Sequence, residues 1–79
     1  MLILLLIDGF RFFFYSIENN EPIQVHVTKG NADGNIWLEP TVEIAYIHGF
    51  SNKEINDIMR LVQENFEQFK NKWNDYFSK

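Results

Sequence analysis

Residues 2–15 read LILLLIDGFRFFFY, and this stretch decides the fold. Two apolar runs flank the dipeptide Asp8-Gly9. Asp-Gly in this setting is typical of a two-residue hairpin turn, because both central residues of a type I′ turn need positive φ. We therefore predict strands at 2–7 and 10–16. Alternation puts Phe10, Phe12 and Phe14 on one face of the second strand. The other face carries Arg11, Phe13 and Tyr15.

The first apolar run is too short to cross a membrane. Seven apolar residues precede Asp8, whereas a membrane-spanning helix needs about 20. The run also lacks the basic leader and small-residue cleavage site of a secretory signal. We predict a buried strand in a cytoplasmic protein that has no contact with a membrane.

The segment EPIQVHVTKG, residues 21–30, continues the sheet. Its alternation points Ile23, Val25 and Val27 one way, with Gln24 and His26 on the opposite face. The glycine-containing segment KGNADG then turns the chain, and NIWLE returns as a further strand. The segment TVEIAYI, residues 41–47, is predicted to form either an irregular segment or an edge strand with three side chains facing inward: Val42, Ile44 and Tyr46.

A long amphipathic helix is predicted over residues 52–78. Ser51 stands three residues before Glu54, the spacing of a capping box. Apolar residues then recur at steps of three and four, and the last of them are Phe69, Trp73 and Phe77.

One straight helix over this range would run about 40 Å, which is longer than a small sheet. Either it is kinked near residues 63–65 and folds back on the core, or its aromatic end projects and binds a partner. The pattern leaves both alternatives open. The fold class is α+β in one domain, residues 1–79: an antiparallel sheet of three to five strands packed with the long C-terminal helix.

Composition and charge exclude several functions. The chain of 79 residues carries a net charge of −4 and no cysteine. The first fifty residues hold only two basic side chains, Arg11 and Lys29, which disfavours a nucleic-acid-binding surface. His26 and His48 are the two histidines, and they lack the spacing of a metal site. We predict no metal and no cofactor.

General acid–base chemistry is the one enzymatic option. Histidine is the side chain suited to proton transfer at neutral pH, and Arg11 and Tyr15 share a face of the strand next to that of His26. If these faces adjoin, the three side chains form a cluster of the kind that a metal-independent ribonuclease uses. The alternative is an ordinary strand histidine, with Arg11 paired to an acid and Tyr15 in the core.

Four segments in order resemble a known family: DGFRFFFYS, EPIQVHVTKG, IWLEP and the helical sequence from Gly49 to Phe77. Together they resemble the small prokaryotic proteins described as domain of unknown function 4160. Members of that family typically carry Pro-Pro-His-x-His-Val. Here His26 matches the second histidine, while Gln24 stands in place of the first and Ile23 in place of the second proline. The opening LILLLI also departs from the usual, more polar beginning.

The resemblance implies a partner rather than a reaction. The family has no established activity, and its genes often adjoin one for a second small protein, domain of unknown function 2442. The pair is suspected to be a toxin–antitoxin module. We therefore favour a non-enzymatic protein that acts by contact with another protein, as a homodimer or with a small partner. Candidate partner-binding residues are Gln24, Phe69, Trp73 and Phe77. The alternative is a ribonuclease-like toxin that uses His26 with Arg11 and Tyr15.

Overall fold

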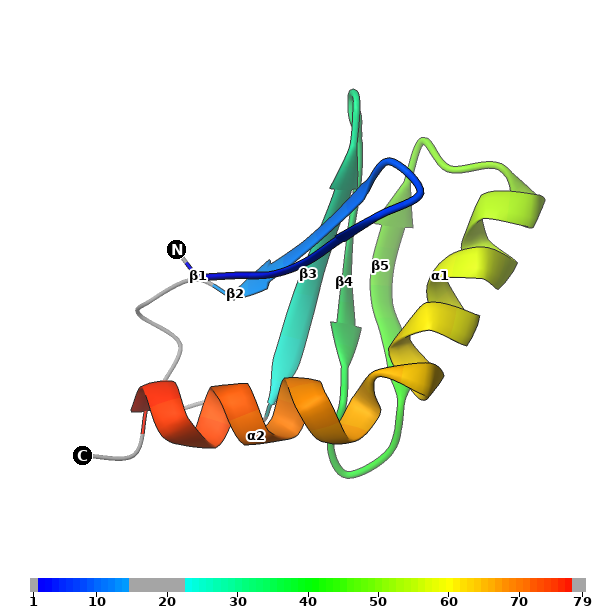
Figure 1. Cartoon of the computed structure of the whole chain (residues 1–79). Helices are drawn as coiled ribbons and strands as arrows, with labels where there is room; N and C mark the ends of the chain where they lie inside the picture. The colour runs from blue at the N-terminus through cyan, green and yellow to red at the C-terminus, as the bar shows by residue number, and fades with distance from the viewer. Residues whose placement is uncertain (1, 15–22, 78–79) are drawn as a thin grey trace.

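The computed structural model describes residues 2–14 and 23–77, with side chains for residues 3–14 and 23–76. Within this part of the chain, five antiparallel strands form one sheet in sequence order, and two helices follow (Figure 1). The elements are β1 (Leu2–Ile7), β2 (Phe10–Phe14), β3 (Gln24–Lys29), β4 (Ala32–Trp37), β5 (Glu43–His48), α1 (Asn52–Glu64) and α2 (Phe66–Phe77). The predicted α+β class is confirmed.

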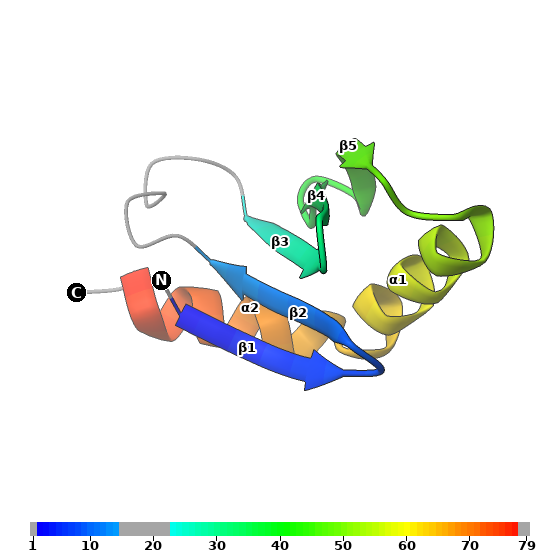
Figure 2. The same ribbon diagram turned by 90° about the horizontal axis from the view of Figure 1, so that it is seen from above.

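The first hairpin forms as its sequence predicts. Asp8 has φ of 55° and Gly9 has φ of 84°, so both central residues take the positive values that a type I′ turn requires. β1 then pairs antiparallel with β2 and forms one edge of the sheet. The sheet twists strongly, so that β1 and β2 run at a steep angle to β4 and β5 (Figure 2).

The core lies between the helices and one face of the sheet. The predicted alternation of β2 is confirmed, because Phe10, Phe12 and Phe14 are all buried in this core. Val25 and Val27 of β3 join them with no exposed surface. We call the opposite side of the sheet the open face, because neither α1 nor α2 packs against it.

The prediction of one long C-terminal helix, kinked or straight, is wrong. The chain forms two helices that meet at Asn65 and point in different directions (Figure 1). The carbonyl oxygen of Leu61 accepts two hydrogen bonds from Asn65, one from its backbone N–H at 3.0 Å and one from its side-chain amide at 2.8 Å. The Asn65 carbonyl in turn accepts from the N–H of Phe69 at 2.9 Å, so the second helix starts at once. A single residue thus ends one helix and begins the next.

The turn at Asn65 brings the aromatic stripe of α2 back onto β2. Phe69 has no exposed surface, and its ring centroid lies 5.7 Å from that of Phe12. Trp73 is 5% exposed and packs edge-on against Phe14, with centroids 4.8 Å apart. Of the two alternatives, the structure shows the one in which the second half of the helical segment folds back on the same core.

The expected orientation of β5 is wrong at Tyr46. The β4–β5 ladder pairs Asn35 with Tyr46 but Ile36 with Ile44, so Ala45 is an extra residue that reverses the alternation. Tyr46 therefore lies on the open face with Asn35. Its neighbour Ile47 packs against the core instead, in space that Gly34 leaves free: a Cβ on Gly34 would come within 2.9 Å of the Ile47 side chain. Val42 faces the core as predicted, whereas Ile44 is 39% exposed.

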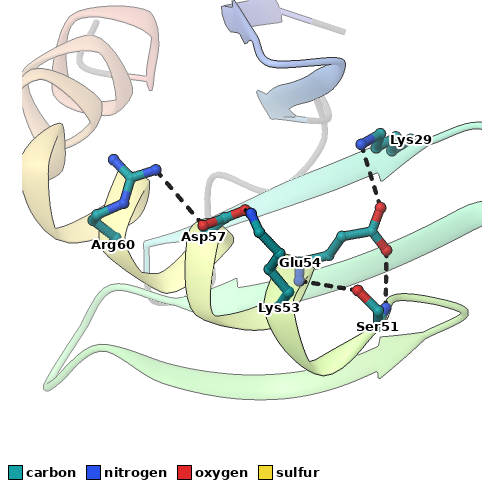
Figure 3. Close-up of polar contacts among 6 residues, drawn as sticks. All are labelled: Lys29, Ser51, Lys53, Glu54, Asp57 and Arg60. Carbon is teal, nitrogen blue, oxygen red and sulfur yellow. Dashed lines mark hydrogen bonds and ion pairs between the residues drawn. The ribbon is translucent and has the colours of Figure 1, made fainter.

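The start of α1 is fixed to the sheet by a polar contact (Figure 3). The capping box is confirmed: the Ser51 hydroxyl accepts from the Glu54 N–H, and the Glu54 carboxylate accepts from the Ser51 N–H at 2.9 Å. The other carboxylate oxygen of Glu54 lies 3.3 Å from the Lys29 ammonium at the end of β3. The Ser51 N–H, followed by the Lys29 ammonium, lowers the pKa of Glu54 below its ordinary value of 4.5.

We predict that a Glu54→Gln variant loses stability relative to the wild-type protein at neutral pH and much less in acid. A carboxyl whose pKa is lower in the folded state stabilises the fold above its unfolded-state pKa. That contribution disappears as the pH falls below 4.5 and through the lowered pKa. Urea denaturation from pH 7 to pH 3 measures the difference. Glu67→Gln is the matched control, and an equal pH dependence in both variants would contradict the prediction.

Candidate functional site

Three of the sequence-predicted site residues, Arg11, Gln24 and His26, lie on the open face. Cross-strand pairing lines up four side chains from β2 to β5, and we call them the central row: Phe13, His26, Asn35 and Tyr46. A second row alongside contains Arg11, Thr28, Asp33 and His48. Antiparallel register alone puts these residues together, because directly opposed side chains share one face.

Stacking and burial restrain His26. Its ring lies 5.5 Å from the Phe13 ring at an interplanar angle of 22°, and the residue is only 8% exposed. On β4 it faces Asn35, an amide that does not titrate. Such a setting suits a histidine that contributes packing and hydrogen bonds, and it gives a substrate little access.

Gln24 and Asn35 form a buried amide pair beside His26. The Asn35 amide donates to the Gln24 side-chain oxygen at 2.5 Å, and the two residues are 8% and 3% exposed. Asn35 Oδ1 has no hydrogen-bond partner among the described residues. Gln24 thus has a structural partner on the neighbouring strand, which explains why an amide is stable at this position.

The proposed catalytic cluster is assembled only in part. Arg11 is exposed and pairs across the strands with Thr28, one row away from His26 on the same face. Tyr15 lies outside the described residues. The nearby carboxylate of Asp33 accepts a hydrogen bond of 3.1 Å from the Tyr46 hydroxyl. Among the described residues there is no group of three or more histidine and acidic side chains that could hold a metal ion.

The predicted partner-binding aromatics are not an exposed stripe where the structure describes them. Phe69 and Trp73 belong to the protein's own core. Phe77 ends α2, and its side chain lies outside the described part. Gln24 is buried in the amide pair. A partner surface therefore has to be sought among other residues.

The most exposed apolar side chains lie on β1. Leu6 is 69% exposed, Ile3 is 46% exposed and Ile7 is 36% exposed. The sequence predicted a buried strand here and did not name these residues as a contact surface, so their exposure corrects that prediction. The sequence does carry a signal for this surface, because residues 2–7 are apolar on both faces. A strand that is buried on one face only usually has polar residues on the other.

The fold and the open face define a small α+β protein with a five-stranded meander and two helices over the described residues. Residues 9–74 match the family described as Domain of unknown function (DUF4160), and the chain belongs to this family. The predicted resemblance is confirmed, and β1 precedes the matched region. No curated protein and no solved structure matches the chain. None of the helices in the described part is long and apolar enough to cross a membrane.

We predict that Gln24 and Asn35 are energetically coupled. Gln24→Leu or Asn35→Leu alone leaves one buried amide without its partner, which costs about 1–3 kcal/mol of unfolding free energy. The double variant removes both amides and should cost less than the sum of the two single changes, by about 0.5 kcal/mol or more. Urea denaturation of the four proteins measures the coupling.

The control for this cycle is Gln24→Leu combined with Lys53→Ala on the exposed surface of α1. Their effects should add to within about 0.5 kcal/mol, because the two side chains share no contact. If the Gln24 and Asn35 changes are equally additive, the amide pair does not act as a unit.

Proposed function

We propose that the protein acts by protein–protein contact and that two copies associate through the edge of β1. The observation that carries this proposal is the exposure of Ile3, Leu6 and Ile7 on an edge strand that has no charged residue. An edge strand presents unpaired backbone N–H and C=O groups. Proteins usually protect such edges with proline or with lysine and other charged residues. β1 has none of these.

The side chains of β1 suit a two-fold interface. Ile3 pairs with Phe13 and Leu6 with Arg11, so both exposed side chains lie on the open face. When two copies of β1 run antiparallel, Ile3 of each copy can lie beside Leu6 of the other. This arrangement is self-complementary, as a two-fold interface must be. It also places no like charges together, although the whole chain carries −4.

The opposite edge of the sheet is less suited to such pairing. β5 carries Glu43 and His48, and the extra residue Ala45 interrupts its ladder with β4. Two copies of β5 would place these charged and polar side chains at the contact, and charged residues protect a sheet edge from pairing. The difference between the two edges is the reason for assigning the contact to β1.

We predict that Leu6→Lys converts a dimer into a monomer. A lysine at this position places a charged ammonium in the apolar contact, beside Ile3 of the other copy, and removes exposed apolar area. Size-exclusion chromatography with light scattering measures the mass directly. Ile44→Lys, on the β5 edge, is the matched control and should leave the mass unchanged. A wild-type protein with the mass of one chain would refute the interface.

We further propose that the protein is cytoplasmic and is one member of a two-gene module of the toxin–antitoxin kind, as the family resemblance implies. Two observations support this proposal. The surface offers contacts to another protein, and His26 is almost fully buried. The ribonuclease-like alternative is supported only by the shared face of Arg11 and His26. We therefore do not advance it as a second function.

We predict that expression of one of the two neighbouring genes arrests bacterial growth and that co-expression of the other relieves it. Growth curves with each gene alone and with both measure the effect, and unchanged growth in all cases would contradict the module. His26→Ala in this chain should leave the growth phenotype unchanged, because His26 is assigned no chemical step. Loss of toxicity in a His26→Ala protein with unchanged Tm would favour the catalytic alternative.

A further inference from the structure

A groove lies where α1 and α2 meet, beside the residue that precedes β5. Its volume is about 560 Å³, and both helices and the β4–β5 connection contribute to it. The lining residues are Val42, Gln63, Glu64, Phe66, Glu67 and Gln68. The break at Asn65 creates this groove, because it turns the last residues of α1 and the first residues of α2 toward the same space (Figure 1).

The floor of the groove is apolar and held in place. Val42 and Phe66 are half-buried, and both pack against the hydrophobic core. The Lys70 ammonium lies 5.2 Å from the centre of the Phe66 ring and covers its other side. Side chains fixed in this way need no ordering when a ligand arrives, which lowers the cost of binding.

The residues that line the groove include two carboxylates and no basic side chain, and Lys70 lies beside them on the Phe66 ring. Glu64 contacts Arg60 at 3.3 Å, whereas Glu67 has no ion pair with any described residue. Gln63 and Gln68 add side chains that both donate and accept hydrogen bonds.

We propose that this groove binds a short basic segment of a different protein, which places an apolar side chain on Val42 and Phe66 and its lysine or arginine residues against Glu64 and Glu67. Charge complementarity determines the choice of occupant. An acidic rim on a protein of net charge −4 attracts a basic partner over long range and repels an acidic one.

A second copy of this chain fits the groove poorly. Most of its described basic side chains already form ion pairs within the chain: Lys29 with Glu54, Lys53 and Arg60 with Asp57, and Lys70 with Glu39. The copy would also bring its own acidic rim close to the first. This surface is separate from the β1 edge, so the proposal does not depend on dimer formation.

The test uses a fluorescein-labelled peptide of eight residues in which valine and lysine alternate, with a valine–glutamate peptide as its counterpart. Fluorescence anisotropy should show binding of the lysine peptide and at least about tenfold weaker binding of the glutamate peptide. Glu67→Gln and Glu64→Gln should each weaken binding about two- to fivefold, the range of an exposed ion pair. Asp75→Asn removes the same charge from α2 outside the groove and should change the affinity less than either.

Amide chemical shifts locate the bound peptide. Changes should concentrate at residues 42–44 and 63–68 and persist in the Leu6→Lys protein, which lacks the proposed dimer contact. The proposal is overturned if both peptides bind equally, if Asp75→Asn weakens binding as much as Glu67→Gln, or if the shifts fall on β1.

Discussion

The packing of α2 against β2 is the contact on which the rest of the structure depends. Phe69 and Trp73 reach Phe12 and Phe14 only because the helical segment breaks at Asn65 and turns back over the sheet. Burying an aromatic side chain of this size contributes roughly 1.5–3 kcal/mol. In a chain of 79 residues two such side chains are a large share of the net stability. The same turn places both helices on one face of the sheet and leaves the open face and both edges to other roles.

The polar side chains of the open face are explained largely by structure. His26 stacks on Phe13, and the Asn35 amide donates a hydrogen bond to the Gln24 side-chain oxygen across two strands. Buried polar groups of this kind fix strand register, because a slip by one residue would separate every pair. A histidine held in such a row offers little access to a substrate. The surfaces that remain for contact with other molecules are the edges of the sheet and the junction of the two helices.

These remaining surfaces differ in chemistry. The β1 edge is apolar and uncharged, and it suits contact with an identical edge. The groove at Asn65 combines an apolar floor with an acidic rim, and it suits a basic segment of another protein. The family match begins at Gly9, so the apolar edge formed by β1 lies before the matched region. A protein of this size can thus carry two separate contacts, one with itself and one with a different molecule.

The sequence by itself determined the features that depend on residues close together in the chain. Asp8-Gly9 specifies the hairpin turn, Ser51 and Glu54 specify the start of α1, and alternation assigns the faces of β2 and β3, since each follows from local backbone geometry. Only the tertiary structure decided whether the helical segment breaks, which way Tyr46 points and whether Phe69 and Trp73 are covered. Helical periodicity is the same on both sides of Asn65. The apolar contacts that stabilise a break there are made with β2, more than fifty residues earlier in the chain. An extra residue such as Ala45 likewise becomes visible only when β5 is paired with β4.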